Sequence, residues 1–193
     1  MAVELKKGQK VNLKKNTGAG PILINLNWDQ PKRRFLFAPR SIDLDLGCLY
    51  ELTNGVKGTV QALGNAFGSL QSPPYISLDG DDRTGAVAGG ENLRINGARI
   101  AELRRVLVYT FIYEGAADWQ TANGVVTVRC PGSEEVIVRM DEYNNARRMC
   151  AIALLENAGD GTLSVEKQVR FFDGHLQMDA AYGWGLRWVT GRK

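Results

Sequence analysis

The feature that most constrains the fold is a nearly continuous run of β-branched and aromatic residues from Val106 to Tyr113, with the sequence Val-Leu-Val-Tyr-Thr-Phe-Ile-Tyr. A run of this composition predicts a central strand that is buried on both faces. Two further runs, Val125–Cys130 and Glu135–Met140, are joined by Pro131-Gly-Ser-Glu134 and predict a hairpin. The hydrophobic pattern of the chain is therefore dominated by strands.

Two dipeptides that favour tight turns divide further apolar runs. Asn54-Gly55 separates Cys48–Thr53 from the next apolar stretch, and both residues tolerate the positive φ of a short hairpin loop. Asp173-Gly174 separates another run from His175–Tyr182 in the same way. The two dipeptides therefore predict two more hairpins.

Helical patterns in the chain are short. Arg99–Arg105 and Asp141–Arg148 are each long enough for only a turn or two, and the 22 glycines cluster between the apolar runs, where turns require them. Many short strands separated by turns predict an all-β fold, an antiparallel β-sandwich with short helical turns. Because there is no internal repeat or low-complexity linker, we expect residues 1–193 to form a single domain.

Composition and charge exclude several classes of protein. The net charge of +3 is too small a surplus to predict a polyanion partner, so no nucleic acid is expected. No apolar stretch is long enough for a signal peptide or for a membrane span of about 18 residues. Three widely spaced cysteines, Cys48, Cys130 and Cys150, predict reduced core thiols and no disulfide framework. We therefore expect a cytoplasmic protein.

The densest group of acidic residues lies in the segment Ser77–Gly85. Asp79, Asp81 and Asp82 fall within four positions, and such a loop gathers the hard oxygen ligands that calcium prefers. A second interpretation remains open, because Asp and Gly are common in turns and Arg83 could neutralise the loop without a metal. The spacing does not fit an EF-hand, which places acidic residues at alternate positions.

A second acidic pair is formed by Asp43 and Asp45, in the segment Asp43-Leu-Asp-Leu-Gly47. Residues two apart share a face of a strand, so both carboxylates would point one way while the leucines point into the core. Unit charges about 4 Å apart repel by about 4 kcal/mol at an effective dielectric constant near 20, so a cation is expected to offset this cost. Glu91, which follows two glycines, is a further candidate ligand.

Several segments resemble one known family, in that family's order along the chain. Gly80-Asp-Asp-Arg-Thr-Gly85 resembles the Gly-Asp-Asn-Arg-Thr-Gly signature of TerD domains. Proteins with these domains are associated with tellurium and stress resistance. Asp43–Gly47 resembles the acidic strand of these domains, and Leu5–Leu13 with Ile22–Asp29 is similar to their first hairpin. The ending Tyr182–Trp188 looks most like the TerA-type branch of the family.

This resemblance implies a calcium-binding β-sandwich with Ca²⁺ as its cofactor. The ligands that it implies, carried over by position, are Asp43, Asp45, Asp81, Asp82 and Glu91. The family's second acidic loop corresponds to Ala86–Glu91, which has lost nearly all of its acidic residues. Because calcium affinity depends partly on the number of charged ligands, we expect one good site and not two.

The function that the resemblance implies is a non-enzymatic, calcium-binding interaction module associated with tellurite and stress resistance. It implies partners among the other proteins of a stress-resistance assembly, and it allows a location at the inner membrane surface. Two alternatives remain open. The first is a metal-independent scaffold in which Arg83 replaces the ion, and the second is a hydrolase that uses the metal to activate water. The single histidine, His175, has no nucleophile or zinc-site pattern around it, so no catalytic residue is expected.

Overall fold

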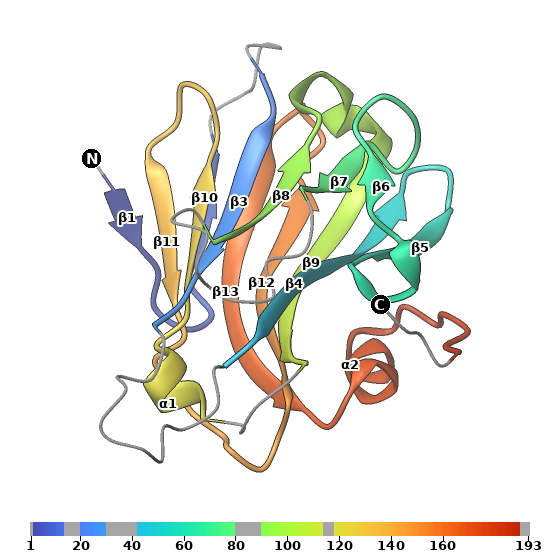
Figure 1. Ribbon diagram of the computed structural model, residues 1–193. Coiled ribbons are helices and arrows are strands. Elements are labelled where there is room, and N and C mark those ends of the chain that lie inside the picture. Colours follow the sequence, from blue (N-terminus) through green and yellow to red (C-terminus); the bar gives the residue numbers. More distant parts are fainter. Residues whose placement is uncertain (1, 14–19, 30–41, 80–89, 114–117, 190–193) are drawn as a thin grey trace.

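The computed structural model describes residues 2–13, 20–29, 42–79, 90–113 and 118–189. These residues form two packed β-sheets, with short helices at their margins (Figure 1). In chain order the elements are β1 (Ala2–Glu4), β2 (Lys10–Asn12), β3 (Ile22–Asn27), β4 (Leu44–Leu52), β5 (Lys57–Val60), η1 (Leu63–Asn65), β6 (Gly68–Ser69), β7 (Ile76–Leu78), β8 (Glu91–Ile95), η2 (Gly97–Glu102), β9 (Leu103–Ile112), α1 (Trp119–Ala122), β10 (Val125–Arg129), β11 (Glu135–Arg139), β12 (Met149–Asn157), β13 (Leu163–Phe172) and α2 (His175–Tyr182).

The two sheets have different strand orders. The first, called sheet A here, has the order β1-β11-β10-β3-β8-β7-β6, and the second, sheet B, has the order β2-β13-β12-β9-β4-β5. Neighbouring strands among the described residues are antiparallel, except for the parallel pair β1–β11. The predicted antiparallel β-sandwich is confirmed.

The main core lies between the two sheets. The residues that face it alternate along the strands, as in Ile24 of β3 and Val126 of β10 in sheet A and Leu44 and Val108 in sheet B, all fully buried. The predicted central strand is β9, which pairs with β4 on one side and β12 on the other and is buried on both faces from Val106 onward.

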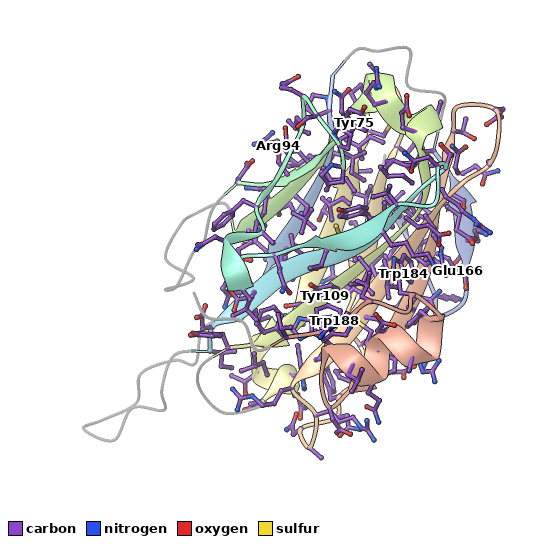
Figure 2. All side chains as sticks on the ribbon, turned by 90° about the vertical axis from the view of Figure 1, so that its right-hand side faces the viewer. Tyr75, Arg94, Tyr109, Glu166, Trp184 and Trp188 are labelled. Carbon is purple, nitrogen blue, oxygen red and sulfur yellow. The ribbon has the colours of Figure 1, made fainter. Side chains whose placement is uncertain are left out.

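A second apolar layer covers the outer face of sheet B, the face turned away from sheet A. It consists of α2 and residues 183–189, which pack on side chains such as Leu49, Tyr109 and Phe111. Tyr109 and Trp188 lie together between sheet B and α2 (Figure 2). This layer explains why β9 is buried on both faces although only one of them meets sheet A.

The prediction of a hairpin after Asp173-Gly174 is wrong, because His175–Tyr182 is the helix α2. Its sequence, His-Leu-Gln-Met-Asp-Ala-Ala-Tyr, contains no β-branched residue and is rich in residues that favour helices. Gly183 ends the helix in the left-handed conformation, with φ 64°. None of the described helices is long and apolar enough to cross a membrane.

The expected first hairpin is also wrong. β2 pairs with β13 in sheet B, whereas β3 pairs with β8 and β10 in sheet A, so the chain crosses between the sheets there. Asp141–Arg148 forms bends and turns without a helix. The helical turn expected at Arg99–Arg105 is a 3₁₀ helix that ends at Glu102, where β9 follows.

Other predictions are confirmed. β10 and β11 form a hairpin, as do β4 and β5. In the β4–β5 loop Gly55 has φ 86°, and the side chain of Asn54 accepts a hydrogen bond from the Val56 amide. Cys48, Cys130 and Cys150 are all buried free thiols.

Candidate metal centre

Asp43 and Asp45 lie at the start of β4, where the chain enters sheet B. Their exposed fractions are 4% and 0%, so both side chains are buried. Leu44 belongs to the core between the sheets, as predicted. Asp45 therefore faces the outer side of sheet B, where it lies opposite Phe111 of β9 in the strand register.

Glu91 links the two sheets at this point. It is the first residue of β8 in sheet A and is 2% exposed. Its Oε2 accepts a 2.5 Å hydrogen bond from the backbone amide of Leu46, the residue after Asp45. β5 pairs with β4 only from Cys48 onward, so Glu91 binds a stretch of β4 that lies beyond the end of β5. Glu91, a predicted ligand from sheet A, therefore lies beside the start of β4 in sheet B, where the predicted ligands Asp43 and Asp45 are located.

Gly90 makes this approach of β8 possible. It has φ +63°, and a Cβ at this position would lie 2.0 Å from the carbonyl oxygen of Leu26 in β3. Such a contact is sterically impossible, and a left-handed conformation is also unfavourable for other residues. Glycine is therefore required immediately before Glu91.

The acidic segment between β7 and β8 begins and ends beside this link. Asp79 at its start donates its backbone amide to the carbonyl of Asn92, next to Glu91. The Asp79 carboxylate forms a bidentate ion pair with Arg94, with a shortest distance of 2.6 Å, and so is already neutralised. Asp81, Asp82 and Arg83 lie outside the described residues. Both ends of the segment that carries them are thus fixed next to Glu91.

The donor chemistry of the described part suits a hard cation. Asp43, Asp45 and Glu91 provide carboxylate oxygens, which calcium and magnesium prefer. Burying carboxylates is costly unless a cation or hydrogen bonds compensate them. Within the described ranges, however, no three His, Cys, Asp or Glu side chains are grouped closely enough to hold a metal ion. A complete site would therefore need ligands from residues 80–89.

Comparison with known proteins gives the family. A model of the TerD domain matches residues 1–156. This chain belongs to the TerD family. The match runs from β1 to the penultimate residue of β12, so it includes Asp43, Asp45 and Glu91, and it ends before β13 and α2.

Relatives of this TerD-family chain carry names that refer to tellurium resistance. It is 44% identical over 189 residues to tellurium resistance protein TerA of Alcaligenes sp, which covers 95% of this chain and 56% of that protein. It is 33% identical over 139 residues to tellurium resistance protein TerX of Serratia marcescens, with coverage of 60% and 64%. The chain thus spans less than two thirds of the length of these relatives.

Solved structures share the fold of this TerD-family chain. SAV2460, a protein of unknown function, superposes with a TM-score of 0.62 and 15% identity, covering 89% of this chain and 100% of that one. A homologue of the telluride resistance protein TerD from Streptomyces coelicolor gives a TM-score of 0.55 and 19% identity, with coverage of 83% and 95%. At these identities the likeness supports the fold alone.

His175 occupies an aromatic pocket in this TerD-family chain. Its ring lies 5.4 Å from that of Tyr109 and 5.3 Å from that of Phe111, and Trp188 packs on it at 4.7 Å. Its Nε2 is hydrogen-bonded to Oε1 of Gln61 at 2.9 Å, and burial lowers its pKa to about 4. His175 is thus a hydrogen-bonded, neutral residue that packs among aromatic rings.

Thr110 is a buried polar residue that the sequence analysis does not single out. It lies in the apolar run of β9 opposite Leu46, and its hydroxyl is buried without a hydrogen-bond partner among the described residues. Buried hydroxyls are normally hydrogen-bonded, so this position next to the Glu91 link is unusual. The only signal in the sequence is a single threonine among the apolar and aromatic residues from Val106 to Ile112.

Proposed function

We propose that this TerD-family chain is a non-enzymatic, calcium-binding interaction module. The observation that carries the proposal is the hydrogen bond from the Leu46 amide to Glu91, which brings an acid from sheet A to the acidic strand of sheet B. Asp45 is the neighbour of Leu46 and is fully buried. A divalent ion would offset the repulsion among these carboxylates.

In this proposal the ligands come from two parts of the chain. Asp43, Asp45 and Glu91 do not form a three-ligand group by themselves. They would supply ligands from the sandwich, and Asp81 and Asp82 would complete the shell from the segment between β7 and β8. When bound, calcium would neutralise the buried carboxylates and fasten that segment to β4. The chain itself contributes the acidic strand and the fixed ends of the segment, Asp79 and Glu91.

The calcium-ordered surface would bind other proteins of a tellurite- and stress-resistance assembly in the cytoplasm, including at the inner membrane surface. The tellurium-resistance names of the relatives support this association. Because the chain spans little more than half of the Alcaligenes protein, further parts of such a protein would share in the assembly.

Two observations support a function without catalysis. His175 is neutral and packed among aromatic rings, as described above, so it is poorly placed to act as a base. Burial raises the pKa of the Cys48 thiol to about 12, and it also raises the pKa of Cys150. Thiols with raised pKa values are poor nucleophiles at neutral pH. A hydrolase would need a general base other than His175.

A metal-independent scaffold is the second candidate. The absence of a three-ligand group within the described ranges favours it, since Arg83 could supply the compensating charge in place of an ion. The two candidates differ in one measurable property, the response of the protein's stability to calcium.

The test is thermal unfolding with calcium and with a chelator. At a calcium concentration about 1,000 times the dissociation constant, binding adds about 4 kcal/mol, which raises Tm on the order of 10 °C for a chain of this size. Asp45→Asn combined with Asp81→Asn should abolish the shift. Asp79→Asn is the matched control, because Asp79 is occupied by Arg94 and the calcium shift should persist.

The results separate the candidates clearly. If calcium leaves Tm unchanged, the scaffold is correct and the calcium proposal is wrong. If calcium raises Tm equally in the double variant, the protein binds calcium through other residues. Titration calorimetry with calcium and magnesium, on the same variants, measures the affinity directly and shows which ion the site prefers.

A further inference from the structure

A cleft of about 470 Å³ lies on sheet B, away from the candidate metal centre. Its lining comes from β2, β9 and β13, from the end of β12 and from the residue after it. The lining residues are Lys10, Asn12, Arg104, Arg105, Glu156, Asn157, Ala158 and Ser164. The volume lies within the range of small-molecule sites.

The strand register explains why these side chains meet. Arg105 of β9 lies opposite Glu156 of β12, Glu156 lies opposite Ser164 of β13, and Ser164 lies opposite Asn12 of β2. Residues opposite one another share a face of a sheet, so these four form one polar row across four strands. The row lies on the outer face of sheet B, the face that α2 covers elsewhere.

The covering layer stops at the edge of this row. The guanidinium of Arg105 stacks on the ring of Trp184 at 3.8 Å, and it donates to the backbone carbonyls of Tyr182 and Gly183 at the end of α2. Figure 2 shows Trp184 at the margin of α2, on the side of Glu166. Beyond Trp184 this layer does not cover the polar row, and the side chains of the row line the cleft there.

Positive charge is concentrated at one end of the cleft. Arg104 and Arg105 share the carboxylate of Glu51, at 3.0 and 2.6 Å, and Lys57 lies 3.9 Å from the same carboxylate. Three cations thus share one buried anion. The side chain of Arg104 remains 68% exposed, and its ion pair uses only one terminal nitrogen, Nη1. Its guanidinium can therefore bind a further anion.

The other end of the cleft is closer to neutral. Lys10 pairs with Glu156 at 2.7 Å and lies opposite Glu166 in the register. Among the described residues in and around the cleft, four cations thus face three carboxylates. The cations are Lys10, Lys57, Arg104 and Arg105, and the carboxylates are those of Glu51, Glu156 and Glu166. Asn12 adds an uncharged polar side chain to the lining. Among the described residues, no aromatic side chain lines the cleft, and Ala158 is the only apolar residue of this lining.

We propose that this cleft binds a small oxyanion, held by Arg104 and Lys10. The planar fork of an arginine matches the geometry of an oxyanion, and a flexible lysine can turn from its exposed carboxylate partner toward a bound anion. Two sources share this chemistry, a phosphate compound and a tellurium oxyanion. The inference does not depend on the calcium proposal, because none of the lining residues belongs to the candidate metal centre.

Titration calorimetry tests this with pyrophosphate, inorganic phosphate and tellurite, each in the presence of a chelator so that calcium cannot contribute. We expect Arg104→Gln to weaken binding about tenfold or more, because a hydrogen-bonded charge is lost. Arg104→Lys should recover only part of the affinity, since it keeps the charge without the fork. Arg129→Gln is the matched control, an exposed arginine of sheet A whose partner is Glu135.

Binding of phosphates alone identifies a phosphate source, and binding of tellurite alone identifies a tellurium source; either result supports the cleft if Arg104→Gln weakens it. The proposal is overturned if none of the three anions binds, or if Arg129→Gln weakens binding as much as Arg104→Gln. Asp45→Asn should leave anion binding unchanged, so failure of the calcium proposal would not affect this result.

Discussion

The indole Nε1 of Trp188 donates a 2.9 Å hydrogen bond to the buried carboxylate of Asp179, nine residues earlier in the chain. The same carboxylate accepts hydrogen bonds from the backbone amides of Gly185 and Leu186, at 2.6 and 2.9 Å. One side chain of α2 therefore fixes the course of the chain that follows it. This segment carries Trp184 and Trp188 onto the outer face of sheet B.

Asp179→Ala should detach this segment. The variant leaves three donors without their acceptor, so we expect the free energy of unfolding to fall by about 3 kcal/mol. Urea unfolding followed by tryptophan fluorescence measures it, and the emission of the native state should also shift to longer wavelength. Asp173→Asn is the control, because Asp173 is exposed and its ion-pair distance to Arg147 is 3.4 Å. Equal stability of Asp179→Ala and Asp173→Asn would contradict this role of Asp179.

Gly47→Ala should destabilise the protein through a steric clash. A Cβ on Gly47 would lie 2.7 Å from ring atoms of Tyr109, which is fully buried. The ring is held by hydrogen bonds of its hydroxyl to Thr59 and Gln61 and cannot easily move aside. We expect a loss of about 2 kcal/mol in the free energy of unfolding.

Gly174→Ala provides the comparison for this clash. Gly174 has an extended φ of 178°, and a Cβ there would meet nothing within 4 Å. Its loss should be smaller, about 0.5–1 kcal/mol, because alanine is a poorer helix N-cap residue than glycine. If both alanine variants unfold at the same urea concentration, the Tyr109 ring does not exclude a side chain at position 47.

Strand positions could be predicted from the sequence, because burial on both faces leaves a direct mark on composition. The run from Val106 to Tyr113 corresponds closely to β9. The assignment of strands to sheets could not be predicted in the same way. Apolar alternation shows which face of a strand is buried, but it does not identify the strand that pairs with it. The expectation that β2 and β3 pair is therefore wrong, because they lie in different sheets.

The error at α2 has a local physical cause. An Asp-Gly dipeptide favours a hairpin turn, but glycine is also accepted at a helix N-cap, which is the position of Gly174. The composition of the next eight residues then decides between helix and strand. In His175–Tyr182 it favours a helix, and this signal should have outweighed the turn signal.

For the candidate site, the sequence predicts which side chains are the candidate ligands but not which groups those side chains contact. The sequence predicts that Asp43 and Asp45 share one face of a strand, and in the structure Asp45 lies in β4 while Asp43 is the residue before that strand. The partner of Glu91 is the backbone amide of Leu46, and a backbone donor leaves no mark in the sequence. In the sequence Asp79 belongs to the acidic cluster, whereas its ion pair with Arg94 across β7 and β8 depends on strand register.

His175 should make the protein less stable in acid. Its pKa of about 4 lies below the ordinary value of 6.5, so between these values the unfolded chain binds a proton that the folded protein does not. Its contribution is therefore present above pH 6.5 and is lost as the pH falls to about 4. After allowance for partial exposure, the expected loss is about 2 kcal/mol.

His175→Gln isolates this contribution. Urea unfolding of both proteins is measured from pH 7.5 to pH 4, and the difference between their free energies of unfolding should change over this window. The carboxylates titrate in both proteins, so their contributions to the free energy of unfolding cancel in the difference. Parallel curves would show that the imidazole does not titrate differently in the folded and unfolded states.

Glu91→Gln distinguishes an ion from a protein cation at the candidate metal centre. The glutamine keeps an oxygen that can accept the hydrogen bond from Leu46, and it removes one buried negative charge. If calcium normally offsets that charge, the variant in chelator should be at least as stable as the wild-type protein, because repulsion with Asp45 and Asp43 is reduced. Its Tm shift with calcium should be smaller, since ligand charge sets part of the affinity.

The opposite pattern is expected for a metal-independent scaffold. If a guanidinium such as that of Arg83 compensates the carboxylates, Glu91→Gln leaves that cation with too little negative charge around it, and removing one partner of a buried ion pair typically costs about 3–5 kcal/mol. The variant would then be less stable than the wild-type protein in chelator, and calcium would change neither. Because the hydrogen bond to Leu46 is retained in both cases, the sign of this change reports only the source of the positive charge.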